Sequence, residues 1–262
     1  MPSVSNIAVG ALVAGSAASK ARHGMNESIA RLSTGMRSMY GGDAAGQSVA
    51  NTLEARSKSW AVAARNAEDG ISVAQTAESA LLEIASLAQR LRELGIQADN
   101  AALHASASDT AALNAEAAAL GTAIDQIVTK ATFNGVVILS KADLTRDIGV
   151  TDDGGTVTLD LKKVSVATRT AAATADGSAD TTLQEVAIAL GNVAAGIAAL
   201  KGRQAVAYSA SANLAAAAAR IEDTDFAKET ANLAKNSVLN QSAMAMVAQA
   251  NQAQSAILAV LQ

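Results

Sequence analysis

A hydrophobic repeat with alternating gaps of three and four residues runs through much of the C-terminal third of the chain, and it constrains the fold more than any other feature. It begins at Leu183 and continues to Ile221, with only Gln204 and Ser211 as polar members. Residues at this spacing share one face of a helix, so the repeat predicts a long helix packed along other helices. Its apolar members are Leu183, Val186, Leu190, Val193, Ile197, Leu200, Ala207, Leu214, Ala218 and Ile221.

The two ends of the chain carry shorter repeats of the same kind. The N-terminal repeat consists of Met25, Ile29, Leu32, Met36 and Met39, and the C-terminal repeat of Leu239, Ala243, Met246, Ala250, Ala253, Ile257 and Val260. An isolated pair of helices rich in Ala, Ser and Gln buries too little surface to fold strongly alone. We therefore interpret both repeats as an assembly seam, which the terminal helices bury against each other and against further copies of the chain.

Further repeats and turn signals predict the elements between the two ends. The first helix is expected to stop at residues 40–43, where Gly41 and Gly42 permit unusual backbone angles. A seam of Val73, Ala77, Ala80, Ile84, Leu87, Leu91, Leu94 and Ala98 predicts a long second helix. A return helix, ending near Lys130, is predicted by Leu113, Ala117, Leu120, Ile124 and Ile127.

The hydrophobic period changes between residues 133 and 180. Asn134 and Gly135 form a turn signal, and the residues that follow, 136–139, are expected to form a short strand. A second strand is predicted at residues 156–161, where apolar and polar residues alternate. Residues 165–182 show no seam and are expected to form an exposed connection before a long helix that starts near Thr182 and changes register at residues 220–226.

These elements predict a mainly α fold, a long antiparallel helical bundle or coiled coil with one or two small β-hairpins. We expect three parts: an N-terminal helix of an inner coiled coil (1–42), a helical bundle with a small β-hairpin region at about 133–180 (43–224), and a C-terminal helix of the same coiled coil (225–262).

Composition argues against most chemical functions. A net charge of −4 with scattered basic residues gives no footprint for nucleic acid, and the chain has no cysteine. No run approaches the roughly twenty apolar residues of a membrane span, so membrane insertion is not expected. His23 and His104 lie far apart and predict neither a metal site nor a catalytic base. We expect no catalytic residues and no cofactor, and we interpret Glu222, Asp223 and Asp225 as helix caps.

Three long stretches resemble bacterial flagellin. Two lie in the N-terminal half, at 29–37 continuing through 43–50 and at 65–84, and the third is 220–229, followed by 248–252. The likeness covers roughly residues 25–139 and 200–262, in matching order. Only about fifty residues separate the helical halves. The resemblance therefore implies a short flagellin without large variable outer domains, and it leaves no room for an inserted enzyme or adhesin domain.

The resemblance implies a structural subunit that polymerises with itself into the extracellular filament of the bacterial flagellum. Further partners implied are the filament cap, the hook-filament junction proteins, the export apparatus and the flagellin chaperone, with export occurring without a cleaved signal peptide. Gln89, Arg90, Glu93 and Leu94 match the stretch that contacts neighbouring subunits and is recognised by the vertebrate toll-like receptor for flagellin. One alternative is the hook-filament junction protein of the same organelle. Another is a cytosolic helical-bundle enzyme or signalling domain, which would need a convergent set of titratable groups.

Overall fold

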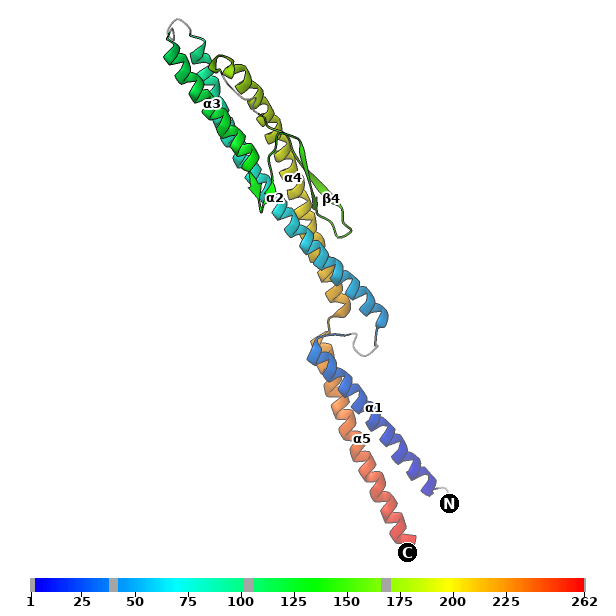
Figure 1. Cartoon of the computed structure of the whole chain (residues 1–262). Helices are drawn as coiled ribbons and strands as arrows, with labels where there is room; N and C mark the ends of the chain where they lie inside the picture. The colour runs from blue at the N-terminus through cyan, green and yellow to red at the C-terminus, as the bar shows by residue number, and fades with distance from the viewer. Residues whose placement is uncertain (1–2, 38–41, 101–105, 166–170, 262) are drawn as a thin grey trace. The chain divides into compact units, whose positions relative to one another are not determined.

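The computed structural model describes residues 3–37, 42–100, 106–165 and 171–261, which form five α-helices and two small antiparallel sheets (Figure 1). The chain divides into two compact units. The terminal unit comprises Met1–Glu54 and Leu214–Gln262, and the central unit comprises Ala55–Asn213. The mainly helical fold with small hairpins is the one that the sequence predicts, whereas the predicted boundaries at 42/43 and 224/225 stay predictions.

The central unit is built on α2 (Ala44–Ala98), whose apolar seam forms one side of its core. Ala77, Ile84, Leu91 and Leu94 of the predicted seam are fully buried, and the rest of that seam packs against the same cluster. The return helix α3 (Ala107–Lys130) begins where the Ser106 side chain accepts a hydrogen bond from the Asp109 backbone N–H at 3.1 Å. This is a standard N-cap, and the helix ends at the predicted Lys130.

Two hairpins follow α3. Strands β1 (Thr132–Phe133) and β2 (Val136–Val137) pair across Asn134 and Gly135, which both have positive φ (49° and 76°), as a type I′ turn requires. The predicted strand at 136–139 thus ends at Val137, because Ile138 and Leu139 turn into the core. The second hairpin pairs the predicted strand β4 (Thr156–Leu161) with β3 (Leu144–Gly149). The sequence does not signal β3 because adjacent Arg146 and Asp147 interrupt its alternation.

The long helix α4 (Ala175–Glu222) begins seven residues before the predicted start at Thr182. A short 3-10 turn, η2 (Ala172–Thr174), precedes it, while residues 166–170 lie outside the described part of the chain. Thr182 is buried rather than exposed. The start of α4 packs so closely on α2 that a Cβ added at Gly95 would lie 2.4 Å from the backbone nitrogen of Asp176. Small residues allow this approach and also hide the helical period from sequence inspection.

The sequence expectation for membrane spans needs correction. With η2, the described helix at 172–222 contains an 18-residue window of mean hydropathy 1.6, long and apolar enough to cross a bilayer by length and composition. Alanine and small aliphatic residues produce this hydropathy. A core helix of a soluble protein satisfies the same test, and Val186, Ala189, Val193 and Leu200 of α4 are buried within the central unit.

In the terminal unit, α1 (Ser3–Thr34) and α5 (Phe226–Leu261) pack on each other (Figure 1). Helix α1 stops at Thr34, earlier than the predicted 40–43, of which 40 and 41 lie outside the described residues. The reason is Gly35, which has φ +74° and donates its N–H to the Arg31 carbonyl at 2.8 Å. A glycine in this left-handed conformation is a common helix C-cap.

Backbone pairing fixes the joint at which α4 ends and α5 begins. Met36 forms an isolated antiparallel bridge with Asp223, flanked by hydrogen bonds from Arg37 N–H to the Glu222 carbonyl (2.6 Å) and from Thr224 N–H to the Gly35 carbonyl (2.8 Å). The predicted register change at 220–226 is therefore a break between two helices. Asp225 caps α5 by accepting from the N–H groups of Ala227 and Lys228, which confirms the capping role for this member of the acidic cluster.

The Arg37 side chain connects this joint to the start of α2. Its Nε and Nη2 atoms donate to the Ile221 carbonyl at 3.0 and 2.9 Å, and Nη2 also contacts the Asp43 carboxylate at 2.7 Å. Asp43 in turn accepts from the Gly46 N–H. The hydrogen bond from Arg37, and to a smaller extent that from Gly46, holds the pKa of Asp43 below its ordinary value. The contact between Arg37 and Asp43 is therefore ionic at neutral pH.

Candidate assembly and recognition surfaces

A groove of about 660 Å³ runs between α1 and α5 in the terminal unit. Its lining is mostly apolar and includes Val9, Val13, Leu239 and Met246, with Lys20 and Asn236 among the polar members. Several of these side chains are largely in solvent: Val13 is 61% exposed, Met246 61% and Leu239 47%. Large apolar side chains held in water along two packed helices mark a surface that a further protein segment can cover.

The predicted assembly seam is divided between this exposed surface and the contact of α1 with α5. On α1, Met25, Leu32 and Met36 are half-buried, whereas Ile29 is exposed. On α5, Leu239 and Met246 are exposed and Ala253 is half-buried. The side chains of Ile257 and Val260 lie outside the described residues, as does Met39. Whether neighbouring subunits cover the exposed members stays a prediction.

The two helices meet through small residues. Ala14, Ala18 and Ala21 of α1 and Ala243 of α5 are buried in the terminal unit. Most of these alanines precede the repeat that starts at Met25, so counting large apolar residues did not identify them. Close helix packing through alanine leaves the larger side chains beside the contact free to point outward.

Polar groups also lie inside the contact between α1 and α5. Glu229 is 7% exposed and its Oε1 lies 3.6 Å from Nη1 of Arg31, while Ser28 is 2% exposed. Asn240 Oδ1 is buried without a hydrogen-bond partner among the described residues. Sequence reasoning missed this set because each residue breaks the apolar pattern. Buried polar residues fix the register of some helix pairs at a cost in stability, so we expect these residues to favour one alignment of α1 with α5.

The second candidate surface is the outer face of α2. Gln89, Arg90 and Glu93 are exposed there, whereas Leu94 is fully buried in the core of the central unit. The structure therefore brings together three of the four predicted recognition residues and places Leu94 behind them, because the seam and the polar face of α2 are adjacent stripes of one helix.

Arg90 organises the charge on this face. Its Nη1 lies 3.0 Å from Glu93 Oε2, one turn along the same helix, and its Nη2 lies 2.8 Å from Glu116 Oε1 on α3. Glu116, and then Glu93, raise the pKa of Arg90 above its ordinary value. The Glu116 contact has no signal in the sequence, since that residue belongs to another helix. The result is a guanidinium fixed between two carboxylates on a solvated face.

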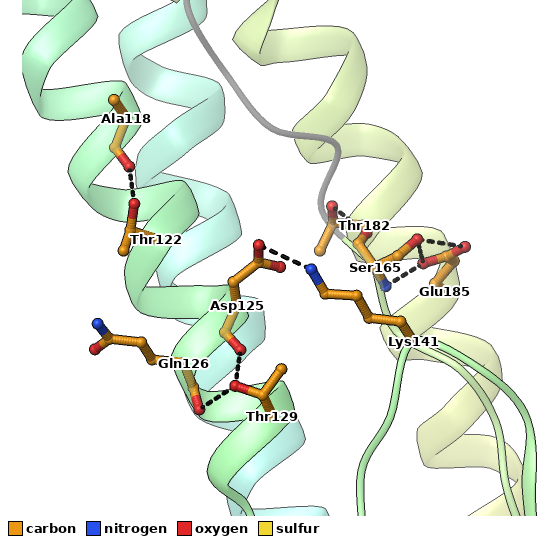
Figure 2. Close-up of polar contacts among 9 residues, drawn as sticks. All are labelled: Ala118, Thr122, Asp125, Gln126, Thr129, Lys141, Ser165, Thr182 and Glu185. Carbon is orange, nitrogen blue, oxygen red and sulfur yellow. Dashed lines mark hydrogen bonds and ion pairs between the residues drawn. The ribbon is translucent and has the colours of Figure 1, made fainter.

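Hydrogen bonds and an ion pair connect the hairpin region to the helices of the central unit (Figure 2). Lys141, after β2, donates to Asp125 of α3 at 2.9 Å. Ser165, after β4, donates its N–H to Glu185 of α4 at 2.7 Å and accepts from the Thr182 hydroxyl at 3.4 Å. Figure 2 shows these residues as separate links between loop and helix. Their arrangement holds the segment in place and presents no convergent acid and base.

No catalytic or metal centre is evident among the residues that the structure describes. No group of three His, Cys, Asp or Glu side chains there is placed to hold a metal ion. His23 lies 3.2 Å from Glu27, one turn along α1, and both are exposed. His104 lies outside the described residues.

Comparison with known families decides the identity. Residues 6–143 match the family described as bacterial flagellin N-terminal helical region, and residues 174–261 match the bacterial flagellin C-terminal helical region. The chain belongs to the bacterial flagellin family. As a flagellin, it is a structural subunit of the flagellar filament and not an enzyme, which excludes the alternative of a cytosolic helical-bundle enzyme.

Individual flagellins agree with this assignment. A flagellin of Halalkalibacterium halodurans is 35% identical over 249 residues, covering 90% of this chain and 91% of the relative. The Bacillus subtilis flagellin is 33% identical, with coverages of 90% and 92%. A flagellin of Salmonella derby is 40% identical over 148 residues, which are 56% of this chain and only 29% of that protein. The chain is thus a short-form flagellin. Among solved structures, Bacillus cereus flagellin shows 26% identity over 57% of this chain and 88% of its own, with a TM-score of 0.39.

Proposed function

We propose that this flagellin assembles with copies of itself into an extracellular helical filament that serves bacterial motility. The observation that supports this most directly is the apolar surface of the terminal unit, where Val9, Val13, Leu239 and Met246 lie exposed along the groove between α1 and α5. One pair of complementary patches, repeated without closing a ring, produces an open helical polymer. Covering this surface with neighbouring subunits removes it from water and drives the polymerisation.

Other partners follow from the family. The filament begins on the hook-filament junction proteins and grows beneath the cap, and the chain reaches the cell exterior through the flagellar export apparatus, guided by a flagellin chaperone and without a cleaved signal peptide. The receptor face around Arg90 is proposed to bind the vertebrate toll-like receptor for flagellin. Each of these partners is part of the proposal.

Electron microscopy of the purified chain, incubated with filament seeds, tests the central claim. Long filaments that grow from the seeds are expected. The alternative, a hook-filament junction protein, would bind the seed ends and stop. The near-complete coverage of the Halalkalibacterium and Bacillus flagellins favours the filament subunit.

Limited proteolysis of the monomer should remove the two ends of the chain before it cuts the middle. The largest fully buried side chains, from Leu81 to Leu200 along the chain, belong to the central unit, whereas the contact of α1 with α5 relies on alanines and a few polar residues. Segments with few buried apolar contacts open locally at low cost. Mass spectrometry should find early cuts within about 1–40 and 225–262 and a resistant centre. Equal resistance throughout the chain would contradict this division.

Arg90→Asp should weaken receptor signalling by the monomer. The substitution reverses the central charge of the face and places three carboxylates together with Glu93 and Glu116. Truncating a hot-spot arginine typically costs about 2 kcal/mol or more of binding free energy. A dose–response curve in receptor-expressing cells measures the change, and intact filaments should signal poorly if neighbours cover the face.

Arg56→Asp is the matched control for this experiment. Arg56 lies on the same helix, is also about half exposed and also forms an ion pair, with Asp152 at 2.7 Å, but it lies outside the recognition pattern. An equal loss of signalling by both variants would indicate a general effect of charge. An unchanged response to Arg90→Asp would exclude Arg90 from receptor binding.

A further inference from the structure

The sulfur chemistry of this chain rests on methionine alone, since the sequence contains no cysteine. Four of its methionine side chains lie among the described residues. Met25 and Met36 are half-buried, whereas Met244 and Met246 of α5 are 51% and 61% exposed. Oxidation of a thioether requires direct access of the oxidant to sulfur. Of these four methionines, the two on α5 are therefore the most accessible to an oxidant.

Met244 and Met246 differ in their surroundings, although only Ala245 separates them. Met246 lines the apolar groove beside Val13 and Leu239. The sulfur of Met244 instead lies 4.0 Å from Nη2 of Arg22, which can donate a hydrogen bond to it. A sulfoxide oxygen is a much stronger acceptor than a thioether. Oxidised Met244 thus gains a charged donor, while oxidised Met246 introduces a polar oxygen into a groove whose lining is mostly apolar.

We propose that Met246 is a reversible oxidation site through which peroxides control assembly of this flagellin. Hydrogen peroxide transfers one oxygen atom to the Met246 sulfur: the O–O bond breaks, an S–O bond forms, the thioether loses two electrons and the peroxide leaves as water. Burial of the resulting sulfoxide against a neighbouring subunit is unfavourable, so the oxidised monomer does not add to a filament. Methionine sulfoxide reductases restore the thioether. The assembly consequence, but not the oxidation itself, rests on the proposed function.

The site is tested first by mapping oxidation in the monomer. The purified full chain is treated with increasing hydrogen peroxide, and mass spectrometry follows sulfoxide formation at each methionine. Met246 and Met244 should oxidise several-fold faster than Met25 and Met36. Equal rates at all four would overturn the site assignment. This readout does not depend on whether the chain polymerises.

Seeded elongation then tests the consequence. Untreated chain should elongate the seeds, and oxidised wild type should lose most of its elongation rate and recover it after treatment with reductases for both sulfoxide epimers. Met246→Leu conserves volume and removes the sulfur, so its elongation rate after peroxide should equal that of the same variant without peroxide, whatever its rate relative to the wild type. Met244→Leu is the matched control and should lose elongation as the wild type does.

The outcomes separate the two proposals. If untreated chain fails to elongate, the proposed function fails, while the oxidation map still decides the modification site. If untreated chain elongates and oxidised wild type elongates equally well, control by Met246 is overturned and the proposed function stands. Loss of elongation in oxidised Met246→Leu would place the sensitive residue elsewhere and also overturn it.

Discussion

Leu94→Ala should lower the free energy of unfolding of the monomer by about 2–5 kcal/mol, the range measured for truncating a buried leucine. Leu94 is fully buried in the core cluster of the central unit, and Gly95 beside it packs on the start of α4. The cavity left by the lost side chain cannot close easily, because α4 is already in backbone contact with α2. Urea unfolding followed by circular dichroism measures the change.

Leu82→Ala provides the control for this prediction. Leu82 lies on the same helix and undergoes the same substitution, but its side chain is 56% exposed. It should change the free energy of unfolding by no more than about 0.5 kcal/mol. A small effect of Leu94→Ala would show that α2 does not bury this position. If Leu94 variants also lose receptor signalling, the loss should follow the unfolded fraction, unlike that of Arg90→Asp.

Met246→Asp should abolish filament elongation while leaving the monomer as stable as the wild type. At 61% exposure, the new carboxylate stays hydrated in the monomer, so the melting temperature should not change measurably. In a filament that covers the groove, the same carboxylate is buried without a partner. A penalty of about 3 kcal/mol per added subunit would raise the critical concentration for growth by about a hundredfold.

Thermal melting of the monomer and seeded elongation measure these two effects separately. Met246→Leu is the control, because it preserves volume and hydrophobicity and should elongate normally. Normal elongation by Met246→Asp would remove Met246 from the assembly surface. A markedly lower melting temperature of the monomer would mean that this side chain supports the fold of the terminal unit instead.

Sequence patterns predicted those helices that contain large, regularly spaced apolar residues. The seam from Val73 to Ala98 and the return helix to Lys130 match the structure because leucine and isoleucine mark the buried face. The same reasoning placed the start of α4 too late, at Thr182, since Ala175 and Ala179 are buried without standing out from an alanine-rich background. Periodicity detects large side chains, while close helix contacts use small ones.

The candidate surfaces were predictable only in part, for a similar reason. The heptad count placed Leu239 and Met246 in one seam with Ala243, yet the structure buries Ala243 against α1 and leaves the other two exposed. A repeat identifies the apolar face of a helix, but it does not show which residues of that face are covered within the monomer and which stay exposed. Likewise, Gln89, Arg90 and Glu93 were identified through their likeness to a flagellin stretch, whereas the Arg90–Glu116 contact depends on how α3 lies beside α2.

The terminal unit consists of two stretches that lie far apart in the sequence, and this determines when the unit can form during protein synthesis. Helix α1 emerges from the ribosome first, but α5 follows only after the whole of residues 55–213 has been translated. During that interval Ala14, Ala18 and Ala21, which are buried in the folded terminal unit, have no helix beside them, while the central unit is already forming its own core. Helix α1 is therefore translated first but is among the last helices to pack in the folded protein. Any factor that shields α1 must act before translation ends.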